Sequence, residues 1–169
     1  MSGRVQVQRR KEKKKEKVEK KEKKEKNPKK EKKEKNPKKE KKPKDVISLS
    51  VAIYRPEDGN LHHWALHLEP HNWVYQVTGE PMDFSVSVTA AIPTNSGRFV
   101  ESIGVAEINP NDLNQLDQII KNTPVQNDVQ GWCCQDFVVE ALELLNEEQI
   151  VDDEDYEGAM AQLREIFNS

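Results

Sequence analysis

Residues 61–68, LHHWALHL, and residues 73–78, WVYQVT, are two strand-like runs separated only by the connection Glu69–Asn72. Aromatic and β-branched residues in an alternating pattern are typical of β-strands. A connection of four residues is short enough to join two antiparallel neighbours. The stretch therefore predicts a β-hairpin.

The two faces of the first strand carry different residues, because side chains alternate along a strand. One face holds His63, Ala65 and His67, and the other holds His62, Trp64, Leu66 and Leu68. We expect Leu68 to pair with Trp73 across the hairpin. This register places His63 diagonal to Gln76, within reach of its side chain.

The remainder of residues 45–169 supplies more strands and then helices. We expect strands at 46–54, 84–90 and 98–108 and helices at 109–122, 132–147 and 154–167. Asn109 and Pro110 are typical of the cap and the first position of a helix. Because the strands come first and the helices later, the sequence predicts an α+β domain, an antiparallel sheet with C-terminal helices.

The first 44 residues differ sharply from the domain in charge. They hold 23 of the 27 Lys and Arg and 8 of the 30 Asp and Glu, a net charge of +15, whereas residues 45–169 carry −18. The nine-residue unit KEKKEKNPK occurs at Lys21–Lys29 and again at Lys30–Lys38. Between Lys11 and Lys44 the only apolar residue besides proline is Val18. Such a segment cannot form a core, so residues 1–44 are predicted to be a disordered lysine-rich tail.

Composition also bears on the compartment and the partners of the chain. No run approaches the roughly 18 apolar residues of a membrane span, and residues 1–14 lack the apolar segment of a secretory signal. We expect a cytoplasmic or nuclear protein, a monomer with reduced thiols. Three partners stay open for the basic tail: anionic lipid, nucleic acid, or the acidic domain of the same chain.

Cys133 and Cys134 are the only cysteines and stand at the predicted start of helix 132–147. A disulfide between them is disfavoured, because adjacent Cα atoms are about 3.8 Å apart, below the usual range for a bridge. Two alternatives stay open. A cysteine here is either a small buried apolar side chain or a reactive thiol.

Helical position favours Cys134 as the reactive one. It shares an inward-facing stripe with Phe137, Val138, Ala141 and Leu145, whereas Cys133 points to the flank that carries Glu140. A thiol in the first turn lies at the positive end of the helix dipole, which favours the thiolate. Backbone N–H groups near Cys134 and Gln135 could also hold an oxyanion.

A nucleophile at Cys134 needs a base, and the candidates are His62, His63, His67 and His71. Most of them are ordinarily explained as surface residues. A shared metal ion is disfavoured, because strand residues four apart are separated by about 13 Å. We therefore expect no metal and no cofactor. His63 is the best-placed base, with Gln76 as the group that orients its imidazole, the third role in a Cys–His–X arrangement.

The motif HHWALHL followed by NWVYQV resembles the His-bearing hairpin of the lecithin–retinol acyltransferase and HRAS-like suppressor family, whose strand typically reads H-W-A-[IL]. That family's second motif, N-C-E-H-F, is matched by CCQDF at Cys133–Phe137. Residues 131–142 are also similar to small fungal proteins of unassigned function with a W-N-C-Q-D-W helix. The resemblance covers about residues 46–147.

The resemblance implies a circularly permuted papain-like fold in which the histidine precedes the cysteine. Cys134 would be the nucleophile, His63 the base, and Gln76 would stand near the family's second histidine. The sequence departs from the family at Cys133, which replaces an asparagine, and at Gln76 itself. The hydrophobic C-terminal anchor of many relatives is also missing, which weakens the case for a lipid substrate.

Together these features predict a thiol hydrolase or acyltransferase that uses a Cys134–His63 dyad on an ester, thioester or amide carbonyl of an acyl or peptide substrate. The alternative is a catalytically inactive interaction module with the same fold and a basic tail. Nucleic-acid binding by the domain itself is disfavoured, because the domain is acidic and lacks interleaved basic and aromatic residues.

Overall fold

A computed structural model describes residues 46–167. The predicted disordered tail, residues 1–44, lies outside the described residues. The elements, in chain order, are β1 (Ile47–Tyr54), β2 (His63–Glu69), β3 (Trp73–Glu80), β4 (Asp83–Ala90), η1 (Pro93–Asn95), β5 (Phe99–Ile108), η2 (Pro110–Asp112), α2 (Leu113–Lys121), α3 (Cys134–Glu147) and α4 (Asp153–Ile166). The predicted α+β class, with an antiparallel sheet and C-terminal helices, is confirmed.

The predicted helix 109–122 is divided in two. Asn109 is the cap, as expected, and its side chain accepts a hydrogen bond from the backbone N–H of Asn111 at 3.0 Å. The first turn that follows is the 3₁₀ helix η2, and the α-helical part, α2, begins only at Leu113. Tight 3₁₀ turns are common at helix N-termini.

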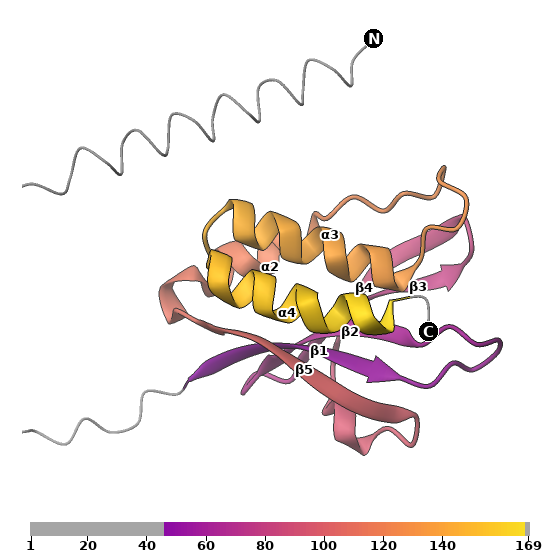
Figure 1. Ribbon diagram of the computed structural model, residues 1–169, viewed down its shortest axis with the longest axis horizontal. Helices are drawn as coiled ribbons and strands as arrows, with labels where there is room; N and C mark the ends of the chain where they lie inside the picture. Colours follow the sequence, from indigo (N-terminus) through magenta and orange to yellow (C-terminus); the bar gives the residue numbers. More distant parts are fainter. Residues whose placement is uncertain (1–45, 168–169) are drawn as a thin grey trace, which may run out of the picture. The chain divides into compact units, whose positions relative to one another are not determined.

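The five strands form one antiparallel sheet in the order β4-β3-β2-β1-β5. The predicted hairpin register is confirmed, because Leu68 pairs with Trp73. Figure 1 shows α3 and α4 side by side over one face of this sheet. The inward stripe predicted for α3 is buried there, against the apolar face of β2: Trp64, Leu66 and Leu68 are all fully buried.

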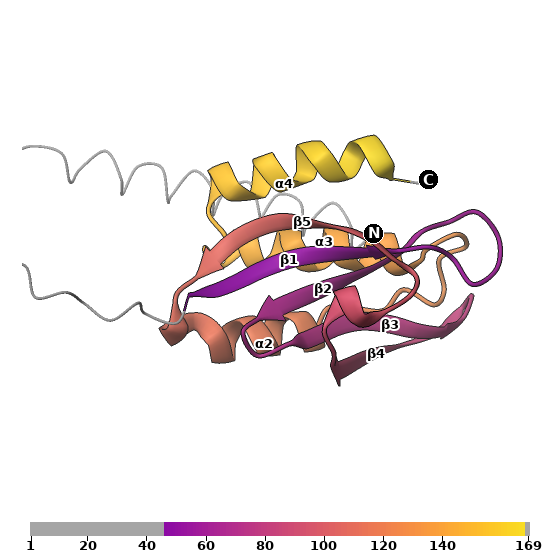
Figure 2. The ribbon, with the colours of Figure 1, turned by 90° about the horizontal axis from the view of Figure 1, so that it is seen from below.

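The connection between β4 and β5 has to cross the whole sheet, because these strands are its two edges. It passes, with η1, over the face away from the helices (Figures 1 and 2). One end is held by a hydrogen bond from Ala91 N–H to the Asn72 carbonyl, 2.8 Å. At the other end Arg55 N–H donates to the Arg98 carbonyl, also at 2.8 Å. The crossing thus brings Arg98 to the end of β1.

The sequence favoured surface positions for most of the four histidines, and His67 is the exception. His67 lies on the face that the connection covers, and only 3% of it is exposed. Its Nδ1 is 3.8 Å from the Glu69 carboxylate, and its Nε2 has no hydrogen-bond partner among the described residues. Burial lowers the pKa of His67, and the charge of Glu69 and a hydrogen bond with Asn72 offset this only in part.

We expect the buried His67 to weaken the fold in mild acid. Because its pKa is lowered in the folded state, its contribution is complete above the unfolded value of about 6.5 and is lost as the pH falls below that value. The slope is at most about 1.4 kcal/mol per pH unit for one proton. Urea unfolding between pH 7 and pH 5 should show this loss, and His67→Met should reduce it. An identical pH dependence in both proteins would contradict the assignment.

Within residues 46–167, no helix is both long enough and apolar enough to cross a membrane.

Candidate active site

Cys134 is the first residue of α3 and lies against the start of β2. Its Sγ is 3.9 Å from the backbone carbonyl oxygen of His62, and the backbone N–H of Trp64 hydrogen-bonds the same sulfur. The buried side chain of Gln135 donates from Nε2 to the His62 carbonyl at 3.1 Å. These contacts join two segments that are 72 residues apart in the sequence.

His63 is the first residue of β2, in the section of that strand that is not paired with β3. The ladder between them ends at the pair Leu66–Tyr75, so His63 lies beyond it. Across this opening His63 Nε2 is 2.8 Å from Gln76 Oε1. An amide oxygen can only accept a hydrogen bond, so Nε2 carries a proton and donates it. Nδ1 is then the ring nitrogen left for a second partner.

The thiol of Cys134 is the other side chain that acts on the His63 imidazole, through hydrogen bonding and through charge. A hydrogen bond from Cys133 and the contact with His63 lower the pKa of Cys134 to about 4, although burial opposes the shift. Burial would also lower the pKa of His63, but the bond with Cys134, its negative charge and Gln76 together raise it. Both shifts favour a thiolate–imidazolium pair near neutral pH.

Cys133 is the N-cap of α3 and has a different environment. Its backbone N–H donates to Asp136 Oδ2 at 2.9 Å, and its Sγ lies 3.3 Å from the same oxygen. The backbone N–H groups of Gln135 and Asp136 are directed back at the Cys133 sulfur. The pKa of Cys133 is raised, first because its proton is shared with Cys134 and then by burial. Neither cysteine forms a disulfide, and the hydrogen bond between them lowers the pKa of Cys134 while it raises that of Cys133.

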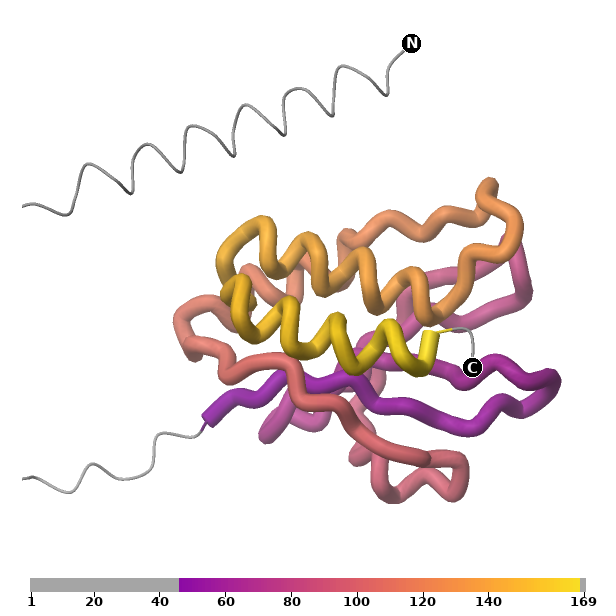
Figure 3. Tube along the Cα trace, in the orientation of Figure 1, coloured from indigo at the N-terminus to yellow at the C-terminus, as the bar shows by residue number. Residues whose placement is uncertain are grey.

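The segment before α3 is held in place by a side chain of α3 and by the backbone of β4. Figure 3 traces residues 122–133 from α2 past the β3–β4 hairpin to the start of α3. Gln126 Nε2 and Trp132 Nε1 both donate to Glu140 Oε1, at 2.7 and 3.0 Å. Asn127 bonds both the backbone N–H and the carbonyl of Phe84, at 2.8 and 3.0 Å. The two cysteines therefore follow a segment with several fixed contacts.

The structure brings three of the predicted site residues together, namely Cys134, His63 and Gln76. The fourth, Gln135, is adjacent, but its N–H faces Cys133 and its side chain serves to hold His62. Of the other histidines, His62 contacts this group through its backbone carbonyl, whereas His67 and His71 lie apart from it. His67 is further along β2 and buried, and His71 stacks on Trp73 in the turn of the hairpin, with ring centroids 4.9 Å apart.

Arg98 is a neighbour of the site that the sequence did not identify. Its guanidinium is close enough to His63 for its charge to lower the pKa of that histidine. No spacing in the sequence connects the two residues, because the approach depends on the β4–β5 connection crossing the sheet. The cap formed by Cys133 and Asp136 differs from the usual capping box, in which Ser or Thr stands three residues before Glu or Gln.

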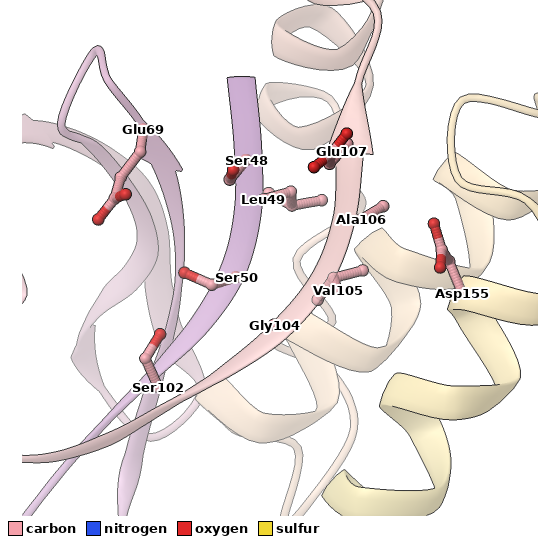
Figure 4. A pocket seen from close by; sticks show the side chains of 10 residues that line it. All are labelled: Ser48, Leu49, Ser50, Glu69, Ser102, Gly104, Val105, Ala106, Glu107 and Asp155. Carbon is pink, nitrogen blue, oxygen red and sulfur yellow. The ribbon is translucent and has the colours of Figure 1, made fainter. Parts of the chain in front are cut away.

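An open hollow of about 620 Å³ lies elsewhere, where β1 and β5 run beside α4 (Figure 4). Ser48, Gly104 and Asp155 are among the residues that line it, and none of the dyad residues does. Among residues 46–167, no group of three or more His, Cys, Asp or Glu is arranged to hold a metal ion.

We expect Cys134 to be alkylated by iodoacetamide at least tenfold faster than Cys133 at pH 6, because only a thiolate is an effective nucleophile and an ordinary thiol has a pKa of about 8.5. Timed quenching followed by peptide mass mapping measures both rates in one sample. Faster modification of Cys133 would reverse the assignment of the two sulfurs.

No curated protein and no solved structure matches the chain significantly. Residues 49–152, well over half of the 169, match the family of unknown function DUF6540, and this segment includes both β2 and the start of α3. The chain therefore belongs to the family of unknown function DUF6540.

Proposed function

We propose that this protein is a thiol hydrolase or acyltransferase with a circularly permuted papain-like domain, in which Cys134 attacks an ester, thioester or amide carbonyl. The observation that carries the proposal is the contact of Cys134, His63 and Gln76, which come from three separate elements. A low thiol pKa, a raised imidazole pKa and an orienting amide are the features that nucleophilic cysteine catalysis needs. The resemblance to the lecithin–retinol acyltransferase family, in the order histidine before cysteine, also supports it.

In the first half of the reaction the Cys134 thiolate forms a bond to the carbonyl carbon, and the carbonyl oxygen takes up the electron pair. His63, as imidazolium, transfers its Nδ1 proton to the leaving alcohol, thiol or amine while the bond to that group breaks. An acyl-enzyme remains. In the second half, water or an acceptor gives a proton to His63, attacks the acyl carbon and regenerates the thiolate.

The transient oxyanion needs donors beside Cys134, and the start of α3 is the nearest source. The backbone N–H of Cys134 is the first donor we assign. Gln135 N–H is directed at the Cys133 sulfur, so it can serve as a second donor only when the Cys133 side chain turns away. Gln76 keeps Nδ1 of His63 aimed at the sulfur by accepting from Nε2 at 2.8 Å.

The experiment that tests the proposal is hydrolysis of 4-nitrophenyl acetate with detection of the acyl adduct by intact mass. Wild-type protein should show a burst of nitrophenol and an acetyl group on the Cys134 peptide. Cys134→Ser should lose at least about 100-fold in rate, whereas Cys133→Ser, the matched control one residue away, should keep the adduct. A wild-type protein without adduct or turnover would instead favour a catalytically inactive interaction module with the same fold.

A further inference from the structure

One end of the sheet forms a row of three rings that begins at the dyad. His63 pairs with Tyr54 across β1 and β2, and Tyr54 pairs with Phe99 across β1 and β5. The ring centroids of His63 and Tyr54 are 6.0 Å apart, and those of Tyr54 and Phe99 are 6.1 Å apart. All three residues are partly exposed. The row offers a partly apolar surface next to the reacting sulfur.

Arg98 stands at the outer end of this row, immediately before Phe99. The hydrogen bond from Arg55 N–H to its carbonyl fixes the backbone there. Its side chain is about half exposed and lies near enough to His63 to act on it electrostatically. The guanidinium Nη1 is 2.8 Å from Glu57 Oε1, and Glu57 is mostly exposed.

Such a cation is rare in this domain. Residues 45–169 contain only four Lys and Arg against 22 Asp and Glu. Lys121 is paired with Asp117 on α2, and Arg164 lies 4.0 Å from Glu157 on α4. The fourth, Arg55, is an exposed residue directly after Tyr54. A domain with such an excess of negative charge repels anions in general, so a cation beside the dyad selects where an anion can approach.

A ligand can replace Glu57 in its ion pair with Arg98 at little cost in stability. Exposed ion pairs contribute little to stability, because solvent screens both charges. A carboxylate on a ligand can therefore replace Glu57 and use the same planar fork of N–H donors. The carboxylate of the ligand would then lie on the side of His63 from which the charge of Arg98 acts.

We propose that Arg98 is a specificity residue of the Cys134 site, and that the substrate carries a carboxylate close to its reacting carbonyl. This inference rests on the proposed function. In the proposed complex, the acyl compound lies along Tyr54 and Phe99. Its carboxylate displaces Glu57 from Arg98, and its carbonyl faces the Cys134 sulfur.

Two alkylating reagents of nearly equal size test this directly. Iodoacetate carries a carboxylate one carbon from its reactive centre, and iodoacetamide is its neutral counterpart. Each alkylates a thiolate by forming the S–C bond and releasing iodide. The measured quantity is the ratio of the two second-order rates at Cys134, determined by quenched mass mapping on the full-length protein at pH 6.5.

Arg98→Gln should lower the iodoacetate-to-iodoacetamide ratio about tenfold, equivalent to about 1.4 kcal/mol. Glu57→Gln should raise it, because it frees the guanidinium. Arg164→Gln and Glu157→Gln are matched controls, since they remove the same charges from an exposed pair on α4. Neither should change the ratio by more than about twofold, because both side chains are exposed and solvent screens their charges.

The outcomes separate the two proposals. Rapid alkylation of Cys134 with a ratio that is the same in wild type, Arg98→Gln and Arg164→Gln overturns the recognition of a carboxylate and leaves the dyad standing. A ratio that falls equally in Arg98→Gln and Arg164→Gln also overturns it, because the effect is then one of net charge. Slow alkylation by both reagents in the wild type overturns the dyad, and with it both proposals.

Discussion

His63→Ala should slow the alkylation of Cys134 by iodoacetamide about 100-fold at pH 6. In the wild type the imidazole helps to keep the sulfur ionised, so the rate should vary little between pH 5 and pH 8. Without it, the pKa of Cys134 should rise toward that of an ordinary thiol, about 8.5. The rate of the variant should then increase about tenfold per pH unit up to that value. A pH–rate profile for both proteins measures the effect.

His71→Ala is the matched control, because His71 stacks on Trp73 in the hairpin turn and is not in contact with the site. Its profile should follow the wild type. The free energy of unfolding of His63→Ala at pH 7 should change little, since the side chain is partly exposed. If His63→Ala kept the flat wild-type profile, the hydrogen bond from Cys133 and the start of α3 would by themselves hold the thiolate, and His63 would not be its base.

The proximity of Cys134, His63 and Gln76 could be predicted from the sequence because each part depends on a local pattern. Alternation in residues 61–68 separates His63 from the apolar face that holds Trp64, and helical spacing turns Cys134 inward. The short connection Glu69–Asn72 then fixes the register that brings Gln76 into reach. Local rules of this kind apply wherever one face of an element is buried.

The surroundings of the dyad could not be predicted in the same way. Arg98 and the burial of His67 both follow from one topological fact, the passage of residues 91–98 across the outer face of the sheet. No sequence pattern predicts the position of Arg98 or the burial of His67, because the strand order β4-β3-β2-β1-β5 is set by long-range packing. The pairing of Gln135 with the His62 carbonyl is equally long-range. A glutamine at this helix position gives no sign of its partner.

Trp64→Ala should lower the free energy of unfolding by about 3–5 kcal/mol, the range for deleting a large buried aromatic side chain. Trp64 is fully buried in the core between β2 and the helices. Its ring meets Phe167 edge to face, with centroids 5.9 Å apart. Denaturant unfolding at pH 7 measures the change. Trp73→Ala is the control, because Trp73 is only half-buried, and it should cost less than half as much.

Trp64→Phe distinguishes the role of the ring from that of its N–H group. Trp64 Nε1 is buried and has no hydrogen-bond partner among the described residues. An unsatisfied buried donor costs about 1–3 kcal/mol, so a phenyl ring removes this penalty while it leaves a smaller cavity than alanine does. Trp64→Phe should therefore cost at most about 1.5 kcal/mol, and it should keep Cys134 reactive, because the contact with the sulfur comes from the backbone N–H of residue 64. A loss as large as that of Trp64→Ala would mean that the indole N–H is satisfied in solution, and that its partner contributes to the stability of the core.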